Sequence, residues 1–200
     1  DYDLSIDKII LDGPRNIKII SSGSGLTDLE NLSFVKKQML IEKISEMEHM
    51  FDIIMLDTGA GIGSNVIHMN QLANKRVVVT TSEPHAMTDA YALIKVLSEQ
   101  NGVKEINLLV NMTRSVNEGV EVYKRLVKVS ESYLDVSINY MGCIPYDPQV
   151  EKNILKQQVV NSNSKTLSGQ AWGYVAKNFF RDTTSTYKHQ NELLNSILTY

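Results

Sequence analysis

Residues 51–61 read FDIIMLDTGAG, an apolar run that ends in an acid and continues into a glycine-rich turn. The run from Ile53 to Leu56 is uninterrupted, as in strands of parallel sheets that are covered on both faces. Asp57 closes the run, and Gly59 and Gly61 follow it. Such a strand with a turn of small residues behind it is typical of a parallel α/β fold.

Four further short apolar runs have the same character, and segments of helical spacing separate them. The runs are residues 17–20, 76–80, 106–110 and 138–142. The helical segments are residues 40–51, 90–97, 115–134, a segment from Pro148 onward, and 172–179. Strand and helix alternating with short connections predicts a doubly wound, mainly parallel sheet with helices on both faces.

Two helix starts and one helix end have clear local signals. Ser115 with Glu118 three residues later forms a capping box, and Asp147 before Pro148 is a typical N-cap. Gly102 is expected to end the helix before it. The helix from Ser115 has an expected inner stripe of Tyr123, Leu126, Val127, Ser130, Tyr133 and Leu134.

Composition excludes several classes of protein. The 200 residues suit one domain, with 42% apolar and 22% charged residues. A net charge of −3 argues against a general nucleic-acid binder. The single cysteine, Cys143, excludes a disulfide framework within the chain and is expected to be a small buried residue at a strand end. No apolar run reaches the length of a membrane span.

Ligands in such sheets bind outside the carboxyl ends of the strands, and Asp57 lies at one of these ends. An unpaired buried carboxylate is costly, so a partner is expected, such as the Mg²⁺ that accompanies a nucleoside triphosphate. Gly59 and Gly61 would let backbone N–H groups approach a phosphate. A capped strand-to-helix turn explains the same residues without a ligand.

Two other strand ends are candidates for a base pocket. Asn111 can both donate and accept hydrogen bonds, which suits a purine edge, although turn chemistry also explains it. Pro145 to Asp147 could wall a base pocket or only cap the next helix. The four histidines have no metal-ligand spacing.

A phosphate-binding loop of the form G-x-x-x-x-G-K-[ST] does not occur in these 200 residues. Lys165-Thr166 follows Ser164 in a polar stretch, so it does not form such a loop. Without that loop and its lysine, a triphosphate is not held in the usual way.

Taken together, four stretches resemble the MinD/ParA family of deviant Walker ATPases. They are residues 51–61, 79–91, 110–112 and 142–147, within a resemblance that covers roughly residues 9–180. The Thr-Gly-Ala-Gly turn, the Glu-Pro…Thr-Asp-Ala-Tyr run and Glu118-Gly119…Tyr123 favour the flagellar branch of that family, called FlhG or YlxH.

The resemblance implies a role for each candidate site residue. Asp57 matches the acid that positions Mg²⁺ through water, and is thus the candidate catalytic and metal residue. Gly59 and Gly61 match the turn that senses the γ-phosphate. Asn111 matches the asparagine that contacts adenine, and Pro145 with Asp147 matches the loop beside the base.

The resemblance also implies cofactors and partners. ATP and Mg²⁺ are expected for the complete domain, with an ATP-dependent homodimer that hydrolyses ATP slowly. Further expected partners are an FlhF-type GTPase, flagellar switch proteins and membrane lipid, but no nucleic acid. The location that follows is cytoplasmic and peripheral, at the inner face of the cell membrane.

The sequence departs from the family pattern at both ends. The phosphate-binding loop is expected ahead of residue 1, so residues 1–182 would be an incomplete ATPase domain, inactive by itself. Residues 183–200 would be a tail that could form a short amphipathic helix; its apolar residues are Leu193, Leu194, Ile197 and Leu198. Membrane docking and packing both stay open for this tail, because it has few basic residues.

Two alternative functions stay open at this point. The first is an interaction module that keeps the fold but works without nucleotide. The second is a chromosome or plasmid partition ATPase, or a division-site ATPase, of the same family.

Overall fold

The computed structural model describes residues 10–20, 42, 46–157, 166–186 and 194–199. It separates into two compact units, residues 1–52 and 53–200.

The first unit contains a small antiparallel hairpin. Strand β1 (Ile10–Asp12) pairs with β2 (Lys18–Ile20), and the 3-10 turn η2 (Pro14–Asn16) joins them. The prediction that residues 17–20 belong to the parallel sheet is therefore wrong. The physical reason is the turn, in which Arg15 and Asn16 have positive φ angles of 55° and 64° and reverse the chain.

Part of the helix expected over residues 40–51, namely residues 40, 41 and 43–45, lies outside the described residues. The part that is described contains the 3-10 turn η3 (Glu48–Met50). Met47, just before it, is buried.

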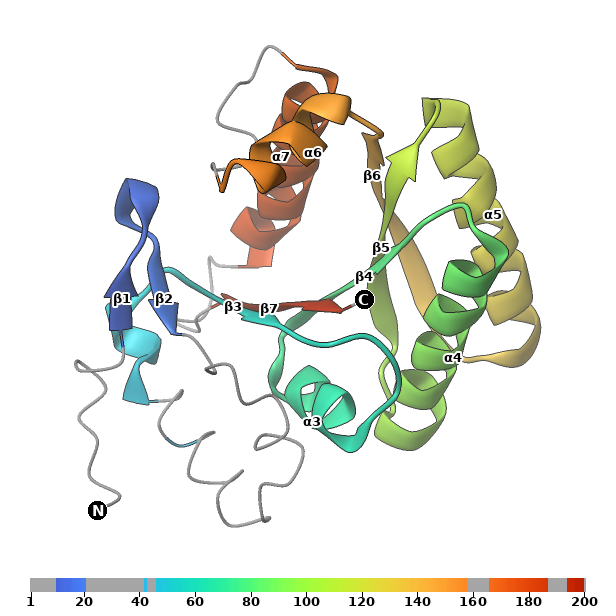
Figure 1. Cartoon of the computed structure of the whole chain (residues 1–200). Helices are drawn as coiled ribbons and strands as arrows, with labels where there is room; N and C mark the ends of the chain where they lie inside the picture. Colours follow the sequence, from blue (N-terminus) through green and yellow to red (C-terminus); the bar gives the residue numbers. More distant parts are fainter. Residues whose placement is uncertain (1–9, 21–41, 43–45, 158–165, 187–193, 200) are drawn as a thin grey trace. The chain divides into compact units, whose positions relative to one another are not determined.

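The second unit is a five-stranded parallel sheet with helices between its strands (Figure 1). Its strands are β3 (Ile53–Asp57), β4 (Lys75–Thr80), β5 (Glu105–Thr113), β6 (Ser137–Pro145) and β7 (Leu194–Thr199). Its helices are α3 (Ser64–Leu72), α4 (Pro84–Asn101), α5 (Val116–Tyr133), α6 (Pro148–Leu155) and α7 (Leu167–Thr186). The strand order is β3-β7-β4-β5-β6, and every neighbouring pair is parallel, which confirms the predicted fold class.

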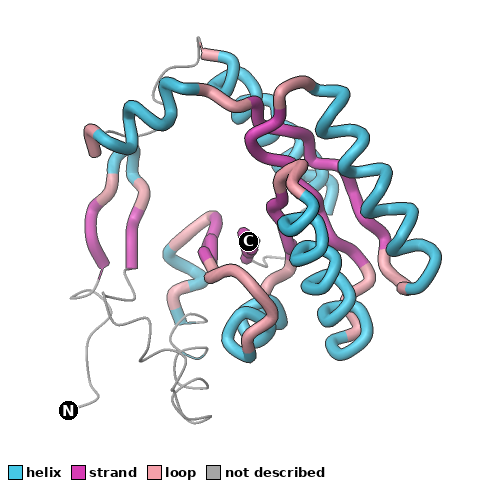
Figure 2. The backbone as a smooth tube through the Cα atoms, turned by 45° about the vertical axis from the view of Figure 1, so that its right-hand side comes forward, coloured by secondary structure: helices cyan, strands magenta, loops and turns pink. Residues whose placement is uncertain are grey.

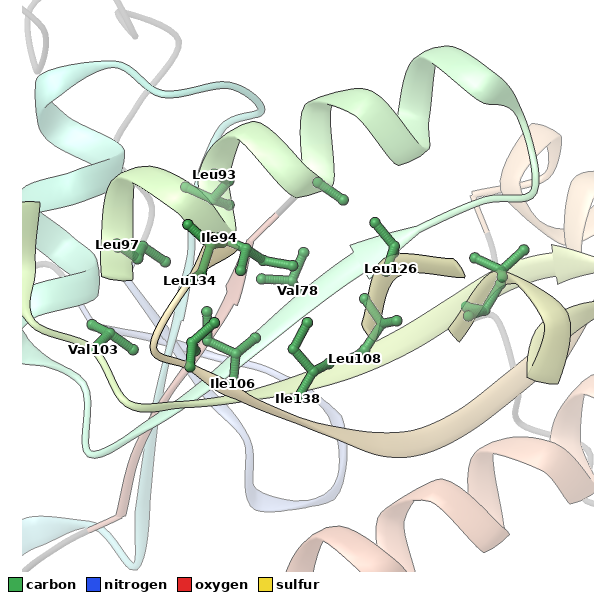
Figure 3. Close-up of a cluster of buried hydrophobic side chains, with 14 of the residues drawn as sticks. Val78, Leu93, Ile94, Leu97, Val103, Ile106, Leu108, Leu126, Leu134 and Ile138 are labelled. Atoms are coloured by element: carbon green, nitrogen blue, oxygen red, sulfur yellow. The ribbon is translucent and has the colours of Figure 1, made fainter. Parts of the chain in front are cut away.

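Helices α4 and α5 cover one face of β4, β5 and β6, and Figure 3 shows the core that they form there. Val78, Ile106 and Leu108 from the strands meet Ile94 and Leu126 from the helices. Side chains of neighbouring residues point to opposite faces of a strand, so these strands need a second apolar layer.

Helix α7 supplies the second layer. Val175 and Phe179 of α7 pack against Val77, Leu109 and Met141 from the opposite strand face. Figure 2 shows that short loops join β4, β5 and β6 to α4 and α5. The nearly continuous apolar runs of β4 and β5 are explained by this cover on both faces.

Strand β3 is less buried than its sequence predicts. Met55 is 56% exposed, and Asp57 at the strand end is exposed as well. Within the described sheet β3 is an outermost strand, which has a neighbour on one edge only.

The C-terminal segment also differs from its expectation. Residues 194–199 form strand β7, whereas the sequence suggested a short amphipathic helix. As a strand, the segment pairs with both β3 and β4, which satisfies backbone groups on both of its edges. Of the helices that the structure describes, none is long and apolar enough to cross a membrane.

Candidate functional site

The carboxyl ends of the strands bring the predicted site residues to one edge of the sheet. Asp57 is the last residue of β3, and Pro145 is the last residue of β6. Thr113, the last residue of β5, lies opposite Pro145 in the β5–β6 register. Because all five strands run in the same direction, their ends share this edge, where α/β sheets bind ligands.

The turn after β3 is open to solvent. A Cβ atom built on Gly59, Gly61 or Gly63 would meet no atom within 4 Å. Gly61 has φ +98°, a conformation that L side chains rarely adopt, so a glycine is required there. The three glycines therefore leave space for a ligand to approach the backbone, as a phosphate-binding turn needs.

The carboxylate of Asp57 is exposed, so the premise that burial forces it to have a partner is wrong. The described residues also contain no group of three or more His, Cys, Asp or Glu side chains that could hold a metal ion. Asp57 would thus be a single protein carboxylate near Mg²⁺. That fits Mg²⁺, which usually keeps several waters and takes one or two carboxylates plus phosphate oxygens.

A bulge at the end of β5 shapes the surroundings of Asn111. The β5–β6 register shifts between Val110 and Thr113, and Met112 has φ +55°. Asn111 Oδ1 accepts a hydrogen bond of 2.9 Å from the Met112 backbone N–H. Bulges and left-handed non-glycine residues are frequent beside functional sites, because they re-aim a side chain. The Asn111 Nδ2 group donates to no atom of the described chain, so it can bind a ligand acceptor.

The loop after β6 is fixed by Asp147. Its Oδ1 accepts the Gln149 N–H at 2.9 Å, which confirms the predicted N-cap of α6. Its Oδ2 accepts the Ser168 hydroxyl at 2.6 Å, which ties the start of α6 to the start of α7. The Ser168 hydroxyl and then the Gln149 N–H hold the Asp147 pKa below its ordinary value. Both oxygens are thus engaged, and Asp147 positions the loop that follows Pro145.

Glu118 links two strand ends, and the sequence pattern indicated only half of this role. Its backbone N–H donates to Ser115 Oγ at 3.2 Å, as the capping box predicts. Its carboxylate accepts the Arg114 backbone N–H and the Ser82 hydroxyl, and these two bonds lower its pKa, the Arg114 bond most. Ser82 follows β4, so the contact joins the β4 loop to the start of α5; no local signal reveals such a long-range partner.

Exposed apolar side chains lie near the ends of β5 and β6 at the same edge. Met112 is 55% exposed, Tyr146 50% and Val116 69%. The Tyr146 hydroxyl lies 3.3 Å from Glu151 Oε2, and the negative charge of Glu151 raises the Tyr146 pKa. Apolar surface beside an unpaired amide donor is suited to a flat, partly polar ligand such as a nucleobase.

Curated proteins similar to this chain include flagellar regulators. The chain is 37% identical over 152 residues to the antiactivator FleN of Pseudomonas aeruginosa, a match that covers 76% of this chain and 54% of FleN. It is 34% identical over 110 residues to the flagellum site-determining protein YlxH of Helicobacter pylori, covering 54% of this chain and 37% of YlxH. The MinD cell division protein of Aquifex aeolicus has the same fold, with a TM-score of 0.67 at 18% identity, over 89% of this chain and 70% of that protein.

The chain belongs to the MinD/ParA family. Septum site-determining MinD proteins are also similar, for example that of Bacillus subtilis at 24% identity over 72% of this chain and 52% of that protein. No family model matches the chain. The chain spans about half the length of FleN and of the MinD sequences that it matches, and less of YlxH.

Proposed function

We propose that this chain is part of an ATP-dependent regulator of flagellar number and placement. The observation that carries the proposal is the bulge at Asn111, whose Nδ2 group has no partner in the described chain and which lies near the sheet edge where parallel α/β sheets typically bind ligands. The sequence similarity to an antiactivator and to a flagellum site-determining protein supports flagellar regulation over partition or division.

Each site residue has a specific part in this proposal. Asp57 orients water around Mg²⁺, and the turn with Gly59 and Gly61 donates backbone N–H groups to the terminal phosphate. When bound, Mg²⁺ neutralises phosphate charge. Asn111 recognises the adenine edge through Nδ2, and Pro145 lies beside the base, ahead of a loop that Asp147 fixes.

The complete protein is proposed to cycle between a monomer and an ATP-bound dimer at the inner face of the cell membrane. The partners in this cycle would be a second copy, membrane lipid, an FlhF-type GTPase and flagellar switch proteins. Hydrolysis would reset the cycle.

The test measures whether the longest protein that the gene encodes is a monomer or a dimer. Its molar mass is determined by light scattering with and without Mg·ATP. The wild type is expected to dimerise with Mg·ATP, and Asp57→Ala to stay monomeric. Asp52→Ala is the matched control, because Asp52 is an exposed acid ahead of β3, away from the carboxyl end of that strand. A wild type that binds no ATP would favour the nucleotide-independent interaction module instead.

A further inference from the structure

One carboxylate ties the loop after β4 to the start of α5. Strands β4 and β5 are neighbours in the sheet, and the helices that follow them, α4 and α5, cover the same face of it (Figure 1). The Ser82 hydroxyl in the β4 loop donates to the Glu118 carboxylate, and the Arg114 backbone N–H donates to Glu118 Oε2 at 2.5 Å. We call this pair of contacts the Glu118 clasp. It joins two loops at the ligand-binding edge that are distant in the sequence.

The capping of α5 does not explain the whole of this clasp. In a capping box the acid at the third helical position turns back to the N–H of the N-cap residue, which is Ser115 here. The Glu118 carboxylate reaches past the N-cap to Arg114, and it also accepts a hydroxyl from another loop. The start of α5 is capped without that hydroxyl, because Ser115 Oγ accepts the Glu118 backbone N–H. The contact with Ser82 is therefore additional to the cap.

The β4 loop has one side-chain anchor outside itself. Within the loop, Thr81 Oγ1 accepts the Glu83 backbone N–H at 3.3 Å. The side chain of Glu83, the N-cap residue of α4, makes no capping bond. Among the residues that the structure describes, the bond from Ser82 to Glu118 is the only side-chain hydrogen bond that joins this loop to another element. Loss of that bond would leave the loop held by its backbone alone.

The other end of the clasp holds the segment that contains Asn111. Met112 has φ +55°, a conformation that a residue other than glycine keeps only where its surroundings hold it. The next residue is held toward β6, because the Thr113 carbonyl accepts the Tyr146 N–H at 2.9 Å. The Glu118 clasp holds the N–H that follows. The chain is thus fixed directly after the bulge, and the direction of the Asn111 amide is fixed with it.

We propose that Glu118 is a positioning residue for nucleotide binding, which holds the β4 loop against the bulge and so aims the Asn111 amide at the base. Glu118 acts through Asn111 and does not touch the base itself. The clasp is present without a ligand, so it orders the site before a nucleotide arrives and lowers the entropy lost on binding. This role rests on the proposed function.

The first test separates the clasp from the helix cap. Ser82→Ala removes the hydroxyl and leaves the Ser115 cap and the Arg114 contact in place. In the longest protein that the gene encodes, this variant is expected to bind Mg·ATP about three- to ten-fold more weakly in calorimetry. Ser82→Thr keeps a hydroxyl and should restore the wild-type affinity. The control Ser132→Ala removes an exposed hydroxyl from α5 and should leave the affinity unchanged. Equal affinity of Ser82→Ala and the wild type would overturn the proposal, since a helix cap alone predicts that result.

The second test contains no nucleotide and follows the clasp itself. Hydrogen exchange with mass spectrometry is measured on the same protein over residues 111–115. In Glu118→Ala the Arg114 amide is expected to exchange about ten-fold faster than in the wild type, and in Ser82→Ala faster by a smaller factor. The amide of Leu108, inside β5, should keep its rate in both variants. Unchanged exchange at Arg114 in both variants would overturn the clasp, whether or not a nucleotide binds.

The two tests together distinguish the clasp from the nucleotide site. A wild type that binds no Mg·ATP, with exchange at Arg114 changed as expected, would show that the clasp exists and that the proposed function is wrong. The positioning role of Glu118 would then be wrong with it. Weaker Mg·ATP binding by Ser82→Ala together with faster exchange at Arg114 would support both.

Discussion

Gly119 lies where α5 contacts β6, and the space there excludes any side chain. A Cβ atom at this position would lie 2.7 Å from Cys143 Cβ and 2.7 Å from the Tyr140 hydroxyl oxygen. The Tyr140 ring can rotate slightly, but Cys143 Cβ moves only with the backbone of β6. Overpacking of this kind costs about 1–3 kcal/mol, whereas glycine to alanine in a helix gains about 0.5–1 kcal/mol. Gly119→Ala should thus lower the free energy of unfolding by about 0.5–2 kcal/mol.

Urea denaturation of the 200-residue chain, followed by circular dichroism, measures this change. Gly173→Ala in α7 is the matched control, because a Cβ there would meet no atom within 4 Å. That variant should be more stable than the wild type by about 0.5–1 kcal/mol. Adding Tyr140→Phe to Gly119→Ala should recover part of the loss, because it removes one of the close contacts. A Gly119→Ala chain at least as stable as the wild type would refute the close α5–β6 packing.

Three further substitutions test the capping, the core and the loop after β6. Ser115→Ala removes the cap of α5 and should lower the free energy of unfolding in urea by about 1 kcal/mol. The control is Ser132→Ala, which removes an exposed hydroxyl within α5. A loss for Ser115→Ala that is no larger than the loss for this control would contradict the cap. Leu108→Ala empties a fully buried site and should cost about 2–5 kcal/mol in the same assay, so a loss under about 1 kcal/mol would contradict the core assignment. The pKa of Asp147 is lower in the folded chain than in the unfolded chain, so its stabilisation is complete at neutral pH and is lost as the pH falls below about 4. Between pH 7 and pH 3 the melting temperature of Asp147→Asn should therefore fall less than that of the wild type. Equal falls would argue against a stabilising contribution from the Asp147 carboxylate.

Local signals predicted the helix boundaries well. Ser115 and Asp147 cap their helices with the expected side-chain bonds, and Gly102 ends α4 with a left-handed φ of 66°. These signals depend on residues within three or four positions of each other, so the sequence contains all the information. Strands β4 and β5 were also predicted from local sequence, because a strand that is covered on both faces has apolar residues at nearly every position.

Features that depend on distant residues could not be predicted in the same way. The interpretation of residues 17–20 overlooked the turn at Arg15. The strand at residues 194–199 pairs with β3 and β4, which are distant in the sequence, so its own residues did not predict it. Tyr133 was expected inside but is 77% exposed, because the chain leaves the helix and Leu134 takes the buried position. Asp57 was expected to be buried, yet its strand has a neighbour on one edge only.

Asn111 and its neighbouring strand ends are proposed to form a nucleotide site. Calorimetric titration of Mg·ATP into the longest protein that the gene encodes tests for this site, with the 200-residue chain measured beside it. The long chain is expected to bind Mg·ATP. Asn111→Ala should weaken this binding about ten-fold or more. Asn139→Ala should leave it unchanged, because the Asn139 amide donates to Glu105. No binding by the long chain, or equal binding by both variants, would contradict the claim.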